Sequence, residues 1–315
     1  MVIIIEKIFV SDAWNLKCWG HENLEFINVA LNTDNLLFID PCLIENWNND
    51  WAKMAVSTMH SFFEELYNAY RNNDTLSKYR LLSHAREQNA TRLGYGSGDN
   101  GKGNSPEGLI HDFRPLEILM HEIDTIGIPQ DLTILIPGFA EDGFSDLLTN
   151  VIHKELNDFT LAQMSRYGIE PNNVTSFYTW DLKLRDWIKV KSPCYIYGED
   201  EILLVPKCIV RKNYLFGVGQ YFERIILERK REEDGWRDDK GRLIPKRDVA
   251  KQLRTEDEHW KYKYAIDYSK KFNDALEEYH KKLPSFYAEY GRPLEDDVLD
   301  EIFYSKKVID SKVKK

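Results

Sequence analysis

Three acidic residues and one lysine lie beside short apolar runs, where α/β folds commonly place their chemistry. Asp146 opens a predicted helix, Asp181 lies just after a predicted strand, and Glu201 directly precedes an apolar run. That run, 202–205, leads through a proline into Lys207. Mg²⁺ prefers oxygen ligands such as carboxylates, and a nearby lysine can orient a water molecule or stabilise developing charge. The pattern predicts a magnesium-dependent hydrolytic site, provided that the fold brings these residues to one edge of a sheet.

A second candidate is the glycine-rich segment 94–104. Its pattern Gly-x-x-x-x-Gly-Lys-Gly is similar to a phosphate-binding loop, but Gly103 stands where that motif has the Ser or Thr that ligates Mg²⁺. No buried strand precedes it, although a helix should follow, whose backbone amides could face an anion. The segment is either a mobile linker or an anion-binding loop at Gly101, Lys102 and Gly103.

Other cofactor chemistry has little support in the residue pattern. The eight histidines contain no HxxxH spacing and the four cysteines contain no CxxC pair, so we expect no zinc site. We expect no nicotinamide or flavin cofactor either. The cysteine pattern is not a disulfide framework, which favours a reducing, cytoplasmic location. No apolar stretch approaches the roughly 18 residues that would cross a membrane, so no membrane partner is expected.

The elements that must position these residues follow from the apolar periodicity. Strands are predicted at 2–10, 25–31, 36–40, 132–136, 174–179, 186–190, 194–197 and 201–206. Helices are predicted at 50–72, 75–90, 106–121, 145–167, 219–233, 246–282 and 294–309. The fold class is therefore α+β, with a mixed β-sheet core flanked by helices.

The chain has 315 residues and a net charge of −10, distributed unevenly. Residues 1–210 hold 17 Lys and Arg against 30 Asp and Glu, a balance of −13, whereas residues 211–315 hold 25 against 22, a balance of +3. This contrast predicts an α+β core domain at 1–215 and a charge-rich helical unit at 216–315.

The C-terminal unit contains an apolar stripe with rough helical spacing. Its members are Tyr262, Ile266, Phe272, Leu276 and Tyr279. We expect the stripe to pack against residues 219–227 or against another chain, either a protein partner or a second copy.

The order helix, β-meander, strand, lysine, helix over about 145–225 resembles the core of the PD-(D/E)xK nuclease family. The resemblance implies that Asp181 binds the metal and that Lys207 is the catalytic lysine. The residue two positions before that lysine should be acidic, but it is valine. The missing acid would have to come from elsewhere, such as Glu155 or Glu201.

Three runs also resemble a family of uncharacterised bacterial cytoplasmic proteins: 36–41, 144–152 and 202–207. This resemblance carries no activity, but it implies a bacterial origin and an association with phage defence. The leading hypothesis is a Mg²⁺-dependent phosphodiesterase that acts on nucleic acid, with Asp146, Asp181 and Glu201 as metal ligands. The alternative is a non-catalytic interaction protein whose C-terminal helices bind a protein partner.

Overall fold

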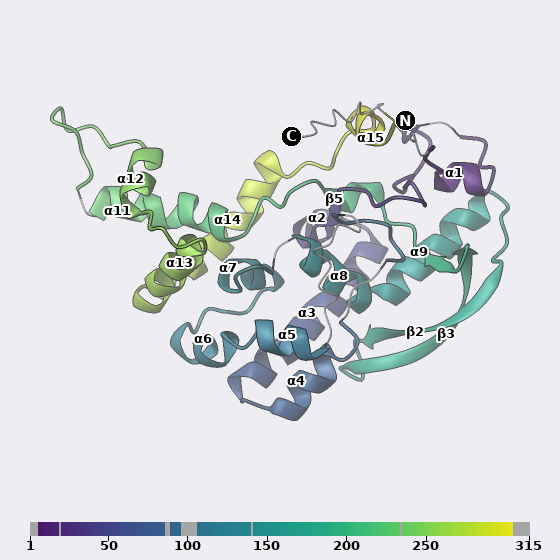
Figure 1. The fold of residues 1–315 in the computed structure, drawn as a ribbon, viewed down its shortest axis with the longest axis horizontal. Helices are drawn as coiled ribbons and strands as arrows, with labels where there is room; N and C mark the ends of the chain where they lie inside the picture. The colour runs from purple at the N-terminus through teal and green to yellow at the C-terminus, as the bar shows by residue number, and fades with distance from the viewer. Residues whose placement is uncertain are drawn as a thin grey trace, which may run out of the picture.

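The computed structural model describes residues 6–18, 20–85, 89–95, 106–139, 141–233 and 235–304. Helices predominate, and the named strands pair antiparallel in two small sheets, which confirms the α+β class (Figure 1). The strands are β1 (Phe38–Ile39), β2 (Asn173–Asp181), β3 (Asp186–Tyr197), β4 (Asp200–Ile202) and β5 (Val210–Arg211).

The helices before the main hairpin are α1 (Val10–Ala13), α2 (Pro41–Asn46), α3 (Asp50–Arg71), α4 (Thr75–Leu82), α5 (Pro106–Asp112), α6 (Leu116–Glu122), the 3₁₀ turn η1 (Pro129–Asp131), α7 (Leu132–Leu135), α8 (Glu141–Val151) and α9 (His153–Arg166). Those after it are the 3₁₀ turn η2 (Lys207–Ile209), α10 (Val218–Tyr221), the π-helical turn η3 (Phe222–Ile226), α11 (Leu227–Glu233), α12 (Lys246–Leu253), α13 (Trp260–Lys271), α14 (Asp274–Tyr290) and α15 (Asp296–Tyr304). Across the described ranges no helix is long and apolar enough to cross a membrane.

The predicted strand at 132–136 is wrong, because this run forms helix α7. All four residues of α7 are buried, and a short, mostly apolar run reads alike for a buried strand and a buried helix. The buried carboxylate of Asp131 accepts hydrogen bonds from the backbone N–H groups of Gly127 and Ile128, at 2.8 and 3.0 Å. These bonds fix the tight turn η1 that starts the helix.

The N-terminal strand predictions also need correction. Of residues 2–10, residues 6–8 have no regular structure, helix α1 begins at Val10, and the first residues lie outside the described part of the chain. Residues 25–31 form only isolated bridges, Phe9 to Ala30 and Phe26 to Pro206. Of the strand predicted at 36–40, only the two residues of β1 are in a strand. The meander is closer to expectation, except that 186–190 and 194–197 are one continuous strand, β3.

The amphipathic helix predicted at 50–72 is confirmed as α3. Asn49 caps its start, since the side-chain oxygen accepts the Ala52 N–H at 2.7 Å. The segment predicted as one helix at 145–167 is two helices, α8 and α9, which meet at Ile152. Gly168, with φ of 71°, ends the second as expected.

The C-terminal helices pack on one another and on the rest of the chain. Leu276 and Tyr279 of the predicted stripe are buried, and α13 and α14 both contact η3, which confirms packing against residues 219–227 within the same chain. The hydroxyl groups of Tyr221 and Ser269 share a hydrogen bond of 2.8 Å. Helix α14 also contacts α2, and apolar packing is continuous from Val10 to Phe303.

A buried carboxylate fixes the contact between α14 and α2. Asp40 is fully buried and caps α2 by accepting the N–H groups of Cys42 and Leu43. The Tyr287 hydroxyl donates to its other oxygen at 2.8 Å. Burial raises the pKa of Asp40 to about 7, despite these hydrogen bonds.

Ionisation of Asp40 should therefore make stability depend on pH. The folded pKa of about 7 lies above the value of about 3.9 for an unfolded chain, so the stabilising contribution is complete below about pH 4 and is lost as pH rises through about 7. We expect Asp40→Asn to flatten this dependence, measured by urea unfolding at several pH values. Asp50→Asn, at an exposed helix start, is the control. A wild-type pH profile in Asp40→Asn would contradict this assignment.

Candidate nucleic-acid interface

The acids predicted to share a metal ion are not brought together. Strand register places Asp181 opposite Asp186 and Glu201 opposite Ile196, so the two acids are paired with residues ten positions apart on β3. At about 3.3 Å per residue, that separation is roughly 33 Å along the strand. The predicted site of Asp181, Glu201 and Asp146 is therefore not assembled. Residues that lie near strand ends in the sequence can be at opposite ends of the sheet in the folded chain.

Each of these residues has another environment. Asp181 caps the β2–β3 turn, Glu201 lies 3.4 Å from the Nε2 atom of His153, and Asp146 lies within helix α8. Lys207 donates to Asp296 at 2.7 Å. No group of three or more His, Cys, Asp or Glu side chains that could hold a metal ion occurs within the described residues.

Of the remaining predicted participants, Glu155 can be placed and the glycine-rich loop cannot. Glu155, the substitute acid, accepts a 2.6 Å hydrogen bond from the Thr58 hydroxyl, and burial raises the pKa of its carboxyl. Gly101, Lys102 and Gly103 lie outside the described residues, so the anion-binding loop stays a prediction.

The β2–β3 hairpin has one covered face. Its ladder runs from Asn173–Cys194 to Asp181–Asp186 without a break. On the covered face, the Phe177 ring stacks on the His153 ring of α9, with centroids 4.0 Å apart and planes at 11°. Figure 1 shows the curved hairpin at the margin of the molecule, with α9 beside it.

The opposite face of the same hairpin is exposed over much of its length. Its cross-strand pairs, three in number, are Val174–Pro193, Ser176–Lys191 and Tyr178–Lys189. All six residues are exposed, and the side chains share one face because strand residues two apart point to the same side. Neither lysine forms an ion pair with any residue that the structure describes.

An aromatic group lies beside these lysines. The Tyr178 ring stacks on the His84 ring at 3.6 Å and 11°, and the Lys189 ammonium lies 6.0 Å from the Tyr178 centroid. His84 in turn contacts Trp187, whose indole N–H donates to the Leu81 carbonyl oxygen at 2.8 Å. The tyrosine is therefore held in place by packed side chains while 37% of it stays exposed.

This face is a local exception to the charge of the chain. Residues 173–197 contain four Lys or Arg and two Asp, a balance of +2, within a segment 1–210 whose balance is −13. Arg185 is already paired with Glu64 and Glu65, at 2.6 and 2.7 Å. The positive charge of this segment that is not engaged in a described ion pair is consequently on Lys189 and Lys191 of the exposed face and on Lys183 of the turn.

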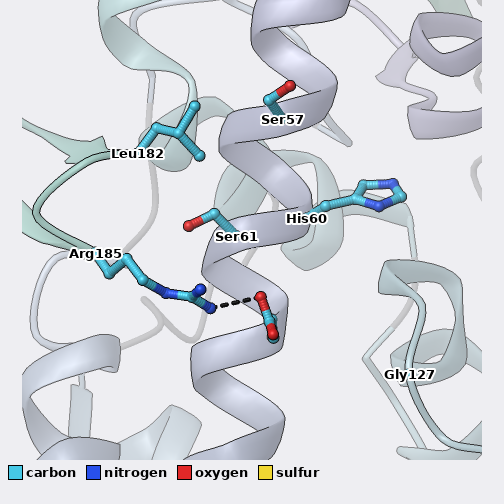
Figure 2. Close-up of a pocket in the computed structure, with 7 residues that line it drawn as sticks. Ser57, His60, Ser61, Gly127, Leu182 and Arg185 are labelled. Carbon is cyan, nitrogen blue, oxygen red and sulfur yellow. Dashed lines mark hydrogen bonds and ion pairs between the residues drawn. The ribbon is translucent and has the colours of Figure 1, made fainter.

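A hollow of about 440 Å³ lies beside the hairpin turn and α3. Its lining, drawn in Figure 2, is Ser57, His60, Ser61, Glu64, Gly127, Leu182 and Arg185. The Arg185 guanidinium reaches Glu64, and His60 lies 3.1 Å from Glu45. The ionisable groups of the hollow are thus already paired, which makes it a weaker ligand site than the exposed hairpin face.

A comparison with protein families matches residues 16–216 to a domain of unknown function (DUF8370). The chain belongs to the DUF8370 family. This agrees with the resemblance to an uncharacterised family without a known activity. No curated protein and no solved structure shows significant similarity to the chain. The hairpin lies inside the DUF8370 match, whereas α10 to α15 follow it.

The residues of this exposed face were missed in the sequence analysis. The alternation Lys189-Val190-Lys191 at the end of the strand predicted at 186–190 was the available signal, since period-2 polar residues mark a solvated face. The stacking of Tyr178 on His84 was not predictable, because the two rings are far apart in sequence and meet only when α4 packs beside the hairpin.

Substitutions of Asp181 test whether its carboxylate stabilises the turn between β2 and β3. Its Oδ1 atom accepts the N–H groups of Lys183 and Leu184 at 2.9 and 2.8 Å. We expect Asp181→Ala to lower the free energy of unfolding by about 1 kcal/mol, because two turn donors lose their acceptor. Asp181→Asn keeps that oxygen and should stay close to wild type. Urea unfolding followed by tryptophan fluorescence checks both, and equal stability of all three proteins would refute the capping role.

Proposed function

We propose that the protein binds single-stranded nucleic acid on the exposed face of the β2–β3 hairpin. The observation that carries the proposal is the pair of unpaired lysines, Lys189 and Lys191, beside the fixed and partly exposed ring of Tyr178. Proteins that bind single strands combine positive charge along the backbone with aromatic rings on which bases stack.

Charge distribution supports this choice of ligand. Phosphates are attracted to lysine side chains, and release of counterions makes such binding favourable at low salt. The acidic remainder of residues 1–210 repels a polyanion, which within that segment favours binding at the hairpin. A partner in the cytoplasm, and a setting in phage defence, belong to the same proposal.

Mg²⁺-dependent cleavage of the bound strand stays a separate prediction. It would require carboxylates other than the set Asp146, Asp181 and Glu201. Asp181 on β2 and Glu201 on β4 pair with opposite ends of β3 and are therefore too far apart to share a metal ion. The alternative of a protein partner on the C-terminal stripe is weakened, since that stripe packs largely within the chain. Incubation of labelled DNA and RNA with Mn²⁺ tests cleavage independently of binding.

Charge reversal on the hairpin should abolish most binding. We expect Lys189→Glu with Lys191→Glu to weaken the affinity for short labelled DNA or RNA strands by at least about tenfold at low salt, because two phosphate contacts become repulsive. Fluorescence anisotropy provides the measurement. Lys212→Glu, at an exposed lysine beyond β5, is the matched control. Binding that is absent in wild type, or equally weakened in the control, would refute the proposal.

The aromatic contribution is tested separately. Tyr178→Ala should weaken binding by about 1–3 kcal/mol through loss of base stacking, without changing the salt dependence. Tyr178→Phe keeps the ring and should bind like wild type. Full binding by Tyr178→Ala would restrict the interface to its charges and remove the stacking role.

A further inference from the structure

Helix α15 covers polar groups of the DUF8370 domain, in a different part of the molecule from the hairpin (Figure 1). Leu299 and Phe303 are its buried apolar anchors. Asp296, Asp300 and Tyr304 are spaced four residues apart and therefore share one side of the helix. This side meets residues that precede it in the chain by 89 to 279 positions.

Three residues form a cradle around the α15 carboxylates. The backbone N–H and the ring Nδ1 of His21 both contact Asp300 Oδ1, at 2.9 and 2.6 Å, and Lys207 Nζ donates to Asp296 Oδ1 at 2.7 Å. Gly20 has φ of +76°, and a Cβ there would lie 2.8 Å from Asp300 Oδ2. A side chain at this position would therefore obstruct the close approach of an anion.

The donors of this cradle are held in place by the domain itself. The Asn28 N–H donates to His21 Nε2 at 3.1 Å, which leaves Nδ1 as the hydrogen-bearing nitrogen. Lys207 Nζ also donates to the His21 carbonyl oxygen at 2.8 Å. His21 is fully buried, and burial lowers the pKa of its ring. Residues of the domain therefore orient the ring and the ammonium group, and Phe303 and Tyr304 of α15 also pack against the ring, with centroids 5.3 and 5.8 Å away.

The donors of the cradle and the carboxylates that accept from them lie in different parts of the chain. Gly20, His21, Asn28 and Lys207 all lie within the family match 16–216, whereas α15 lies outside it. A set of backbone N–H, imidazole N–H and ammonium donors suits an oxyanion with several acceptor oxygens, because hydrogen bonds to a charged acceptor are strong. A phosphate group has several acceptor oxygens, and its negative charge is similar to that of the two α15 carboxylates together.

We propose that Gly20, His21 and Lys207 form a phosphate-binding cradle that α15 occupies with its own carboxylates, so that a phosphate group and docked α15 exclude each other. The proposal does not depend on nucleic-acid binding by the hairpin. Lys207, predicted from the sequence as catalytic, is instead a ligand-binding residue of this cradle.

The first test uses the unaltered chain. Hydrogen exchange of α15 is followed by mass spectrometry in inorganic phosphate and in chloride at the same ionic strength. We expect exchange at 296–304 to accelerate several-fold in phosphate, while exchange in α3 stays unchanged. Equal exchange of α15 in the two salts, up to saturating phosphate, would overturn the proposal.

The second test removes the internal acceptors. The variant Asp296→Ala with Asp300→Ala should bind inorganic phosphate at least about tenfold more tightly than wild type in calorimetric titration, and adding Lys207→Ala should abolish that gain. Asp297→Ala, on an exposed position of the same helix, is the matched control. Affinity of the double variant no greater than that of the control would refute the proposal, and the exchange test stands even if a variant fails to fold.

The source of the phosphate is distinguished in a further arm. Short strands with and without a 5′-phosphate are titrated into the same double variant, which also carries Lys189→Glu and Lys191→Glu to suppress the hairpin. Tighter binding of the phosphorylated strand than of inorganic phosphate assigns a nucleic-acid end. Equal binding assigns free phosphate or a small phosphate ester, and no binding of either contradicts the cradle.

Discussion

The buried Asp40 carboxyl is the constraint on which the arrangement of the two ends of the chain depends. It caps α2 and accepts the Tyr287 hydroxyl of α14, while the Tyr214 hydroxyl donates to the neighbouring Ile39 carbonyl oxygen at 2.8 Å. Burying a carboxyl group without hydrogen-bond partners costs free energy. Asp40 therefore needs the Tyr287 hydroxyl and the two backbone N–H groups of α2 as donors. Its position therefore fixes where α14 crosses the domain and, through α14, where the chain leads into α15.

The proposed nucleic-acid interface depends on how the β2–β3 hairpin is anchored to the core. The end of the hairpin is anchored by Trp180, whose indole N–H donates to Ser61 at 3.2 Å, and by Trp187 against Phe62. One end is thus packed into the core, whereas the face around Lys189 and Lys191 projects beyond it. This division lets the same strands contribute to the core and present a ligand surface, because successive side chains of a strand alternate in direction.

Local sequence patterns succeeded where local chemistry decides the structure. Helix α3 was predicted from its apolar period, and the Asn49 cap found in the structure fixes its first residue. The run 132–136 was misassigned because four of its five residues are apolar, which removes the periodicity that separates helix from strand. The metal site failed for a related reason, since nearness to strand ends does not establish that the ends coincide.

The sequence by itself determined the α+β class, most of the longer helices, the hairpin elements and the uneven charge, since each depends on composition or on residues a few positions apart. Only the tertiary structure decided which charges are free. Lys207 and Lys189 both belong to the strand-rich segment, yet Lys207 is paired with Asp296 from a distant helix, whereas Lys189 stays exposed beside Tyr178. The physical reason is that ion pairing depends on distances between side chains, and long-range packing sets those distances.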